Sequence, residues 1–404
     1  MKPRPAYLLR FTAFVVCFLP AEASRELVFV QAIWRHGDRA PLSLPYPRDP
    51  YTESAWQRGW QQLTNIGMNQ LNELGKYFRT RYNSFLPSHF IPSQVYIRSS
   101  DSDRALTSAQ AFLSGFYPAE GSFQWEKGNS WQPIPVHAAT PGDPDLLLKP
   151  ASTYCKNYDT LVDSDDKKQA DVYNVKNADL FKLLGEQTGI KNFSYVNVNK
   201  IYDVNRELIH NMTERQPAWV FQKWPEYNGS GTMDIITELR RIRMMTRFNS
   251  PQKSKLVGGY LLNNWVQNAQ KVANGSMDVP QKMLLLSSHD TALLALMYAM
   301  NVANDLMVPY GSALIMEIYK DNNDYMVELL YRNDTTRVPY TLQIPECGNP
   351  CTVQKMAEQY PNMVLSSLSE QQKLCGTPLK ECNGSSAAVY FFLCLFISTA
   401  INFL

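Results

Sequence analysis

The sequence carries almost no net charge. Its 404 residues include 39 lysines and arginines and 37 aspartates and glutamates, which leaves a formal net charge of +2. This excess comes from Lys2, Arg4 and Arg10, which outnumber Glu22 within Met1–Ser24, so the rest of the chain is neutral. A neutral body argues against general binding to nucleic acid, and any attraction for anions must be local.

Metal-binding and nucleotide-binding patterns are also missing. The chain has five histidines, which are scattered, and none lies beside a pair of cysteines. Zinc sites need such ligands at close spacing, so a zinc centre is not expected. There is no Walker-type phosphate loop, no two-metal phosphatase motif and no internal repeat or low-complexity linker. We therefore expect neither a metal nor another cofactor.

The N-terminus has the three parts of a secretory signal peptide. Basic residues precede the apolar run Phe11–Leu19, and Ala21-Glu22-Ala23 forms a small-x-small cleavage pattern. The apolar run is too short to span a membrane. We assign residues 1–24 to the signal peptide and expect the mature chain to begin near Ser24 or Arg25.

The C-terminus ends in an apolar tail. Residues Ala388–Leu404 carry no charge, no lysine or arginine follows them, and the small residues Asn383–Ser386 precede them. This pattern predicts a lipid-anchor signal whose tail is removed, although the usual polar spacer is almost absent. A membrane span near the lower length limit and a buried C-terminal strand or helix are the alternatives. We treat residues 384–404 as this tail.

Residues 25–383 show two textures. Strand-like runs and amphipathic helical patterns occur over 25–144 and 251–383. They predict helices over Thr64–Tyr82 and Leu256–Asn274 and a hairpin of Ala313–Tyr319 with Tyr325–Tyr331. Residues 145–250 instead hold helical patches at Asn177–Gly189, Tyr202–Glu214 and Thr232–Arg247, separated by loops rich in Asn, Trp and Pro and without a clear strand. This arrangement predicts an α/β domain in two halves, with a sheet flanked by helices and a smaller helical subdomain inserted at 145–250.

A basic run lies in the inserted segment, on a predicted helix over Thr232–Arg247. Its members are Arg240, Arg241, Arg243 and Arg247. We expect them to coat one helix face. A patch for anionic substrates is the functional alternative.

Polar residues follow three predicted strands. The run Leu27–Ile33 leads into Arg35–Pro41, with the sequence Arg-His-Gly-Asp-Arg-Ala-Pro, and a second strand, Gln94–Arg98, leads into a polar stretch that ends at Arg104. A third strand over 283–287 runs into Ser-His-Asp-Thr at 288–291. Ligands in open α/β sheets bind at the carboxyl ends of strands, so these three junctions are candidate parts of one site.

The first junction suits a phosphate group. Arg35 and Arg39 flank His36, and guanidinium forks match phosphate oxygens bidentately. An imidazole held between them can act as a nucleophile rather than as a base. We expect Gly37 to let the backbone come close to the bound group.

The pattern Arg-His-Gly-x-Arg-x-Pro, with the later pair His289-Asp290, resembles the signature of the histidine acid phosphatases, a secreted branch of the phosphoglycerate-mutase-like clan. The likeness covers nearly all of Glu26–Cys382. It implies a phosphoglycerate-mutase-like fold and the hydrolysis of phosphate monoesters through a phosphohistidine intermediate, without a metal.

The resemblance also implies roles for six residues. His36 attacks phosphorus and Asp290 protonates the leaving alcohol. The phosphate oxygens are bound by Arg35, Arg39, Arg104 and His289. Acid phosphatases and many microbial phytases of the clan carry the His-Asp pair, whereas inositol-polyphosphate phosphatases often carry glutamate there. The disulfide-type cysteines and the animal-like sequence context favour an acid phosphatase over a phytase. A phytase or inositol-polyphosphate phosphatase is the alternative within the clan, and a catalytically dead secreted anion-binding protein is the alternative of another class.

The cysteines and glycosylation signals agree with secretion. Cys17 and Cys394 lie in the terminal segments, and the other five are expected to form bridges in an oxidising compartment. The resemblance implies Cys155–Cys375 and Cys347–Cys351, with no partner assigned to Cys382. Six Asn-x-Ser/Thr triplets are candidate glycosylation sites: Asn192, Asn211, Asn228, Asn274, Asn333 and Asn383.

These patterns predict a protein of the secretory pathway, located at the cell surface or in the lysosome. Its expected partners are small phosphate monoesters and, through the C-terminal tail, a membrane. Relatives in the resembled family are often dimers, which makes a homodimer an expectation, although no motif locates an interface.

Overall fold

The computed structural model describes residues 25–377. The expected signal peptide and C-terminal tail lie outside this range, as do Cys382 and Asn383. Within the described range, none of the helices combines the length and the apolar character that crossing a membrane requires.

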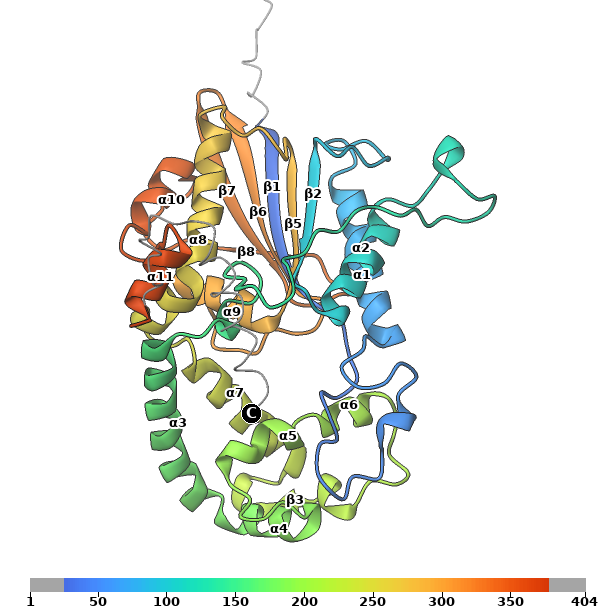
Figure 1. Ribbon diagram of the computed structural model, residues 1–404, viewed down its shortest axis with the longest axis vertical. Coiled ribbons are helices and arrows are strands. Elements are labelled where there is room, and N and C mark those ends of the chain that lie inside the picture. The colour runs from blue at the N-terminus through green and yellow to red at the C-terminus, as the bar shows by residue number, and fades with distance from the viewer. Residues whose placement is uncertain (1–24, 378–404) are drawn as a thin grey trace, which may run out of the picture.

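A mixed sheet forms the centre of the molecule (Figure 1). Strand β1 (Glu26–Arg35) lies between β5 (Met283–Ser288) and β6 (Ala313–Asp321), and the order along the sheet is β2-β5-β1-β6-β7-β8, with β9 paired to β7. The remaining strands are β2 (Val95–Ser99), β7 (Asp324–Arg332), β8 (Tyr340–Leu342) and β9 (Cys351–Thr352). The expected hairpin is formed by β6 and β7, which pair antiparallel.

Helices cover both faces of the sheet (Figure 1). One face carries α1 (Asn65–Arg81) and α2 (Asp103–Phe116), and the other carries α8 (Pro251–Ala273) and α9 (Asp290–Ala299). Two further short helices, α10 (Val353–Gln359) and α11 (Leu368–Leu374), lie beside α8.

Strand β1 shows how the sequence builds the two apolar cores. Side chains alternate between the faces of a strand. Phe29 and Ile33 therefore enter the core beneath α8 and α9, whereas Val30, Ala32 and Trp34 enter the core beneath α1 and α2. Because both faces of β1 are buried, the strand is apolar from Leu27 to Trp34 except for Gln31, as expected for the middle of a sheet.

Helix α1 agrees with its prediction. Its N-cap is Thr64, whose hydroxyl accepts a hydrogen bond from the Gly67 amide at 3.1 Å. Leu71, Leu74 and Phe78 recur at three- and four-residue spacing and are fully buried. An amphipathic stripe with a capping hydroxyl at its start was sufficient to locate this helix.

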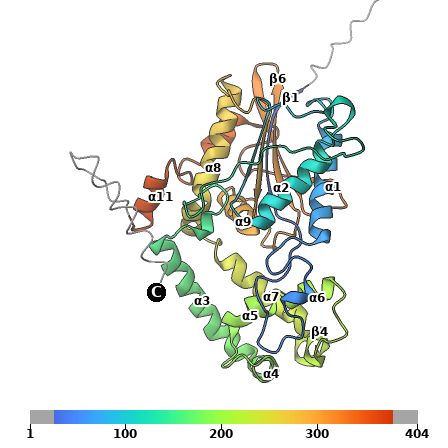
Figure 2. The same ribbon diagram turned by 45° about the vertical axis from the view of Figure 1, so that its right-hand side comes forward.

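The inserted helical subdomain lies at one end of the sheet (Figures 1 and 2). Its helices are α3 (Lys156–Lys176), α4 (Ala178–Thr188), α5 (Val198–Ile201), α6 (Val204–Ile209) and α7 (Thr232–Thr246). They enclose a separate apolar core that includes Trp219 and Ile236. Tyr46, from the Pro- and Tyr-rich loop after β1, also enters this core, so that loop is attached to the subdomain.

Three predictions in this segment were wrong. Helix α3 was not expected, because within it only Tyr158 is buried and an apolar stripe is almost absent. The helix expected over Tyr202–Glu214 is only Val204–Ile209. No strand was expected, yet β3 (Lys223–Trp224) and β4 (Ser230–Gly231) pair antiparallel. Two-residue strands leave no alternating pattern to detect.

Short 3-10 turns connect several of these elements. They cover Glu53–Ala55, Gly121–Phe123, Pro150–Ser152, Tyr195–Asn197, Ala218–Phe221 and Pro225–Tyr227.

Two disulfides, Cys155–Cys375 and Cys347–Cys351, pair the cysteines that the family resemblance implied. The first joins the start of α3 to the residue after α11, which ties the inserted segment to the C-terminal part of the chain.

Candidate active site

The three polar junctions meet at one edge of the sheet. Strands β1, β5 and β2 run parallel, with Arg35 opposite Ser288 and Ser99 opposite Ser287. The backbone continues this pairing beyond the strands, since the His36 amide donates to the Ser288 carbonyl at 2.9 Å. The residues that follow the three strands therefore face a common space, although Ser100 and His289, for example, are 189 positions apart in sequence.

His36 is buried and held in one tautomer. Its Nδ1 lies 2.8 Å from the Gly37 carbonyl oxygen, which can only accept a hydrogen bond. Nδ1 therefore carries the proton, and Nε2 keeps its lone pair. The Arg104 Nε–H donates to this Nε2 at 3.2 Å. The nitrogen that is free to attack phosphorus is thus the one that faces the arginine.

The surroundings of His36 keep the ring neutral. Burial is the main cause, and the positive charges of Arg35 and Arg104 add to it, so the pKa of His36 lies well below its usual range. The ring of His289 lies 5.4 Å away, edge to face. A neutral imidazole is the form that acts as a nucleophile.

Arg35 and Asp290 form an ion pair across the first and third junctions. Arg35 Nη2 lies 3.0 Å from Asp290 Oδ2, while Nη1 donates to the Val308 carbonyl at 2.6 Å. Asp290 is the first residue of α9, and its Oδ1 accepts from the Thr291 amide at 2.8 Å. Burial alone would raise the pKa of Asp290, but the guanidiniums of Arg35 and Arg240 outweigh it, so the pKa is lowered.

His289 lies beside the second junction. Its Nε2 is 2.8 Å from the hydroxyl oxygen of Ser100, which follows β2. Burial and the nearby charge of Arg104 lower the pKa of His289 to about 3, so this ring is also neutral in mild acid.

The loop Arg35–Pro41, called the catalytic loop below because it carries His36, is packed directly against α1 through glycines. A Cβ atom on Gly37 would lie 2.2 Å from the Gly67 carbonyl oxygen, a distance at which the backbone would have to shift. We expected Gly37 to make room for the bound group. The structure gives a different reason for the glycine, because it lets the loop touch the first turn of α1.

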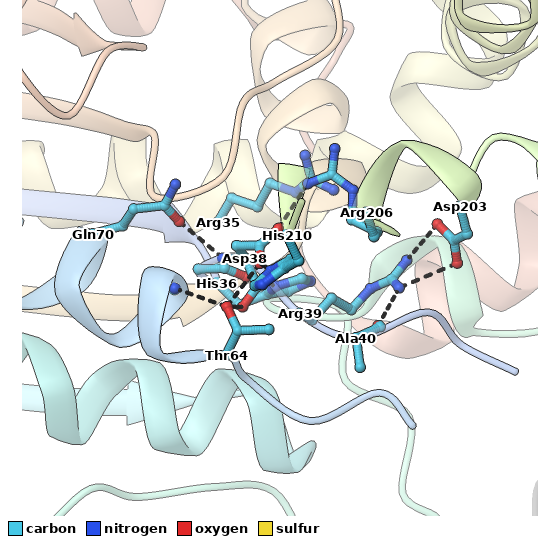
Figure 3. A network of polar contacts seen from close by, with 12 residues as sticks. Arg35, His36, Asp38, Arg39, Ala40, Thr64, Gln70, Asp203, Arg206 and His210 are labelled. Atoms are coloured by element: carbon cyan, nitrogen blue, oxygen red, sulfur yellow. Dashed lines mark hydrogen bonds and ion pairs between the residues drawn. The ribbon is translucent and has the colours of Figure 1, made fainter. Parts of the chain in front are cut away.

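Asp38 connects this loop to the inserted subdomain (Figure 3). Its Oδ1 accepts from Arg206 at 2.7 Å, and its Oδ2 lies 2.7 Å from His210 Nε2 and from the Thr64 hydroxyl. Burial would raise the pKa of Asp38, but the hydrogen bond to His210 and the Arg206 charge lower it. The carboxylate is therefore charged, buried and fully bonded.

A second ion pair crosses between the same two parts of the chain. Arg39 Nη1 lies 3.2 Å from Asp203 Oδ2 and also donates to the Ala40 carbonyl at 2.8 Å (Figure 3). Burial opposes the charged form of Arg39, but Tyr310 and Asp203 outweigh it and raise its pKa. Arg39 is thus held in place from the subdomain side.

The sequence reasoning missed these partners, although a signal for them existed. Asp203, Arg206 and His210 recur at spacings of three and four, which places them on one face of a helical stretch. A stripe of polar residues of both charges on this predicted helix would have indicated that they have charged partners elsewhere in the chain.

Tyr310 completes the surroundings of the nucleophile. The Arg35 guanidinium lies 3.8 Å above its ring centroid and that of Arg206 4.8 Å away, and the His36 ring is at 5.6 Å. A cavity of about 740 Å³ opens here, lined by Arg35, Tyr202, Arg206 and Tyr310 among others. Its size is in the range of small-molecule sites.

The structure thus brings the sequence-predicted site residues to one place. His36, Arg35 and Arg39 come from the end of β1, Arg104 from the first turn of α2, and His289 and Asp290 from the end of β5 and the start of α9. Among residues 25–377 there is no cluster of three or more His, Cys, Asp or Glu side chains that could hold a metal ion.

Of the candidate glycosylation asparagines, Asn192, Asn211, Asn228 and Asn274 are exposed and Asn333 is half-buried.

Comparison with known proteins identifies the class. Residues 26–332 match the profile of the histidine phosphatase superfamily (branch 2), so the chain belongs to that superfamily. It is 34% identical to human prostatic acid phosphatase, over 83% of this chain and 85% of that protein. It is 35% identical to rat lysosomal acid phosphatase, over 86% and 81% of the two chains. The expectation of a histidine acid phosphatase is confirmed.

Solved structures confirm the fold. The phytase from Citrobacter braakii matches with a TM-score of 0.60 at 17% identity, covering 87% of this chain and 99% of that one. The apo form of Hafnia alvei phytase matches with a TM-score of 0.61 at 15% identity, covering 88% and 99%. The predicted sheet flanked by helices with an inserted helical subdomain is therefore correct.

Proposed function

We propose that this acid phosphatase hydrolyses phosphate monoesters through a phosphohistidine at His36. The observation that carries the proposal is the orientation of its ring, since Nδ1–H is bonded to the Gly37 carbonyl at 2.8 Å and Nε2 faces Arg104. In this step Nε2 donates its electron pair to phosphorus, the bond from phosphorus to the ester oxygen breaks, and water later attacks the phosphoenzyme to release phosphate.

Three arginines and a histidine bind the phosphate oxygens. Arg35, Arg39 and Arg104 supply charge, and His289 supplies one neutral ring nitrogen. Phosphoryl transfer needs mainly positioning and charge neutralisation, which preorganised guanidiniums provide. The hydrogen bond from Arg104 to His36 has to be exchanged for one to phosphate before Nε2 can react.

Asp290 acts as the general acid toward the leaving alcohol. In the free site it is ionised and paired with Arg35 at 3.0 Å. A bound phosphate competes for Arg35 and adds negative charge beside the carboxyl group, and both effects raise its pKa. Substrate binding thus converts a paired carboxylate into a proton donor in mildly acidic solution.

Rapid quenching with radiolabelled nitrophenyl phosphate tests this proposal. The enzyme should form a base-stable, acid-labile phosphoenzyme, and His36→Ala should not, while the control His89→Ala should behave like the wild type because His89 stacks on Phe123 instead. Activity should also survive strong chelators. A phosphoenzyme formed by His36→Ala, or loss of activity that a divalent ion restores, would contradict the mechanism.

We also infer delivery to the secretory pathway with retention at a membrane through a lipid anchor. The support is the N-terminal signal pattern and the uncharged C-terminal run after small residues. Phosphatidylinositol-specific phospholipase should release the protein from intact cells. Retention of a product that still contains residues 391–403 would instead favour a membrane span. The homodimer stays a prediction that sedimentation of the purified protein can check.

A further inference from the structure

Arg240 differs from the other basic residues of α7. Arg241 donates to Glu238 and to the Asp305 carbonyl at 2.8 Å, and Arg243 donates to Asp166 at 2.7 Å. Arg240 has no hydrogen-bonding or ion-pair partner among residues 25–377, and its guanidinium lies 5.8 Å from the ring centroid of Tyr202. The expectation of a basic coat on one helix face is therefore wrong: Arg241 and Arg243 are two positions apart, lie on different sides of α7 and are bonded to different segments, and Arg240 has no such bond in the described part of the chain.

Arg240 lies beside a residue that lines the cavity next to Arg35 and Tyr310. Tyr202, over whose ring it lies, lines the cavity of about 740 Å³ that also contains Arg35, Arg206 and Tyr310. Its charge lowers the pKa of Asp290, and among the charged groups only Arg35 has a larger effect on that carboxyl. Asp290 is paired with Arg35, and Arg240 lies beside Tyr202, so both groups neighbour residues that line the same cavity.

Arg240 is also without a charge partner in the site. Arg35 pairs with Asp290, Arg39 with Asp203, and Arg206 with Asp38. That leaves Arg104 and Arg240, to which no carboxylate is bonded among residues 25–377. Burial lowers the pKa values of both, and the charge of Asp290 offsets this only in part. Arg104 faces the nucleophile, whereas Arg240 comes from the opposite, subdomain side.

The protonation state needed for catalysis adds to this excess of positive charge. When Asp290 carries a proton, Arg35 loses its counterion as well. A phosphate dianion then offsets two of the three uncompensated charges, Arg35, Arg104 and Arg240. A buried cation that stays uncompensated is unfavourable, and a second anion near it is attracted strongly.

We propose that Arg240 binds a second anionic group on the leaving-group half of the substrate. The enzyme then prefers phosphate monoesters of acidic alcohols and phenols over those of neutral ones. Tyr202 and Tyr310 offer aromatic faces for a planar leaving group between the two charges. This inference rests on the phosphatase reaction proposed above and adds the class of substrate to it.

A matched pair of substrates tests it. In 3-carboxyphenyl phosphate the leaving phenol carries a charge, and in 3-carbamoylphenyl phosphate an uncharged group of the same shape takes its place. Wild-type kcat/KM should favour the carboxylate, chiefly through KM. Arg240→Gln should lose about tenfold on the carboxylate substrate and less than about threefold on the carbamoyl one, since hydrogen bonds to charged groups are worth about this factor or more. Arg240→Lys should recover part of the preference.

The controls separate this inference from the phosphatase reaction itself. Arg241→Gln, which removes a neighbouring arginine bonded to Glu238, should leave the ratio of the two substrates unchanged. His36→Ala should abolish turnover of both. Equal losses on both substrates in Arg240→Gln would overturn the inference, because Arg240 would then act on the phosphate or on Asp290. A wild-type enzyme that hydrolyses both equally well would overturn it too, while leaving the phosphatase reaction intact.

Discussion

The Nε–H of Arg104 donates a hydrogen bond to Nε2 of His36 at 3.2 Å, so the nitrogen that we propose as the nucleophile contacts a guanidinium that we propose binds phosphate. The same arginine helps to keep the imidazole neutral, because its charge lowers the pKa of His36. One residue therefore prepares the nucleophile before the reaction and is positioned to hold the phosphate during it.

Replacing Arg104 should therefore damage catalysis much more than stability. Arg104→Lys keeps the charge but loses the planar fork, and we expect kcat/KM for nitrophenyl phosphate to fall by about 10²–10³. Steady-state kinetics at fixed mild acidity measures this. Arg58→Lys, an exposed arginine at the rim, is the control. A loss below about threefold would remove Arg104 from phosphate binding.

The importance of Asp290 should depend on the leaving group. Nitrophenolate departs readily without a proton, whereas an alkoxide does not. Asp290→Asn should reduce phosphoenzyme formation from glycerol phosphate at least about tenfold more than from nitrophenyl phosphate. Single-turnover measurements compare the two. Equal losses would leave Asp290 as a positioning residue for His289 or water.

The pH profile should follow the same carboxyl group. Arg35 and Arg240 lower the pKa of Asp290, so the protonated donor becomes scarcer as the pH rises. Turnover of alkyl phosphates should fall from mildly acidic to neutral pH, and more steeply than turnover of nitrophenyl phosphate. A profile of kcat against pH for both substrates checks this. Parallel profiles would assign the pH dependence to another group.

The bond between Asp38 and Arg206 should join the catalytic loop to the inserted subdomain. Both side chains are buried, and removing one partner of such a pair destabilises a protein by about 3–5 kcal/mol. Asp38→Asn should lower the free energy of unfolding by about this amount in urea titrations. It should also reduce kcat about tenfold, because His36 and Arg39 on the same loop lose their support.

A double substitution and a surface control make this prediction specific. Asp38→Asn combined with Arg206→Gln should cost less stability than the sum of the two single changes, since the double variant leaves neither member of the pair as a lone buried charge. Asp171→Asn removes an exposed carboxylate whose Lys167 partner is 3.3 Å away on the same helix, and it should change stability little. Strict additivity would mean that the two residues do not act as a pair.

A buried pair of carboxyl groups should make the fold more stable in acid. Burial raises the pKa of Asp49 to about 6, and burial and the Asp49 charge raise that of Glu207 to about 8. The folded protein therefore binds protons that the unfolded chain has already lost, so the free energy of unfolding falls as the pH rises from about 4 toward 8. This pair joins the loop after β1 to α6, next to Arg206.

Thermal unfolding at several pH values checks the effect. The melting temperature should fall between pH values of about 5 and 8, and Glu207→Gln should flatten that slope because the amide cannot ionise. Glu226→Gln, an exposed carboxyl group in the same subdomain, is the control and should keep the slope. An unchanged slope in Glu207→Gln would show that the pair does not govern it.

The sequence by itself determined the elements whose information is local. Period-two and three-to-four-residue patterns located β1, β5, α1 and α8, because burial of one or both faces of an element is written along its own residues. The motif at Arg35–Pro41 and the pair His289-Asp290 indicated the family and the proposed reacting groups for a related reason, since each is contiguous in the chain.

Only the tertiary structure decided what surrounds those groups. Whether Asp38 meets Arg206, whether Arg240 faces the cavity or the solvent, and whether Asp49 shares its burial with Glu207 depend on how the inserted subdomain packs against the sheet. The contacts of Asp38 with Arg206 and of Asp49 with Glu207 join residues about 160 positions apart in sequence. A periodic pattern in the local sequence cannot predict contacts over that separation. Side-chain charges also act through space rather than along the chain, so the pKa directions at His36, His289 and Asp290 follow from burial and neighbours that folding alone brings together.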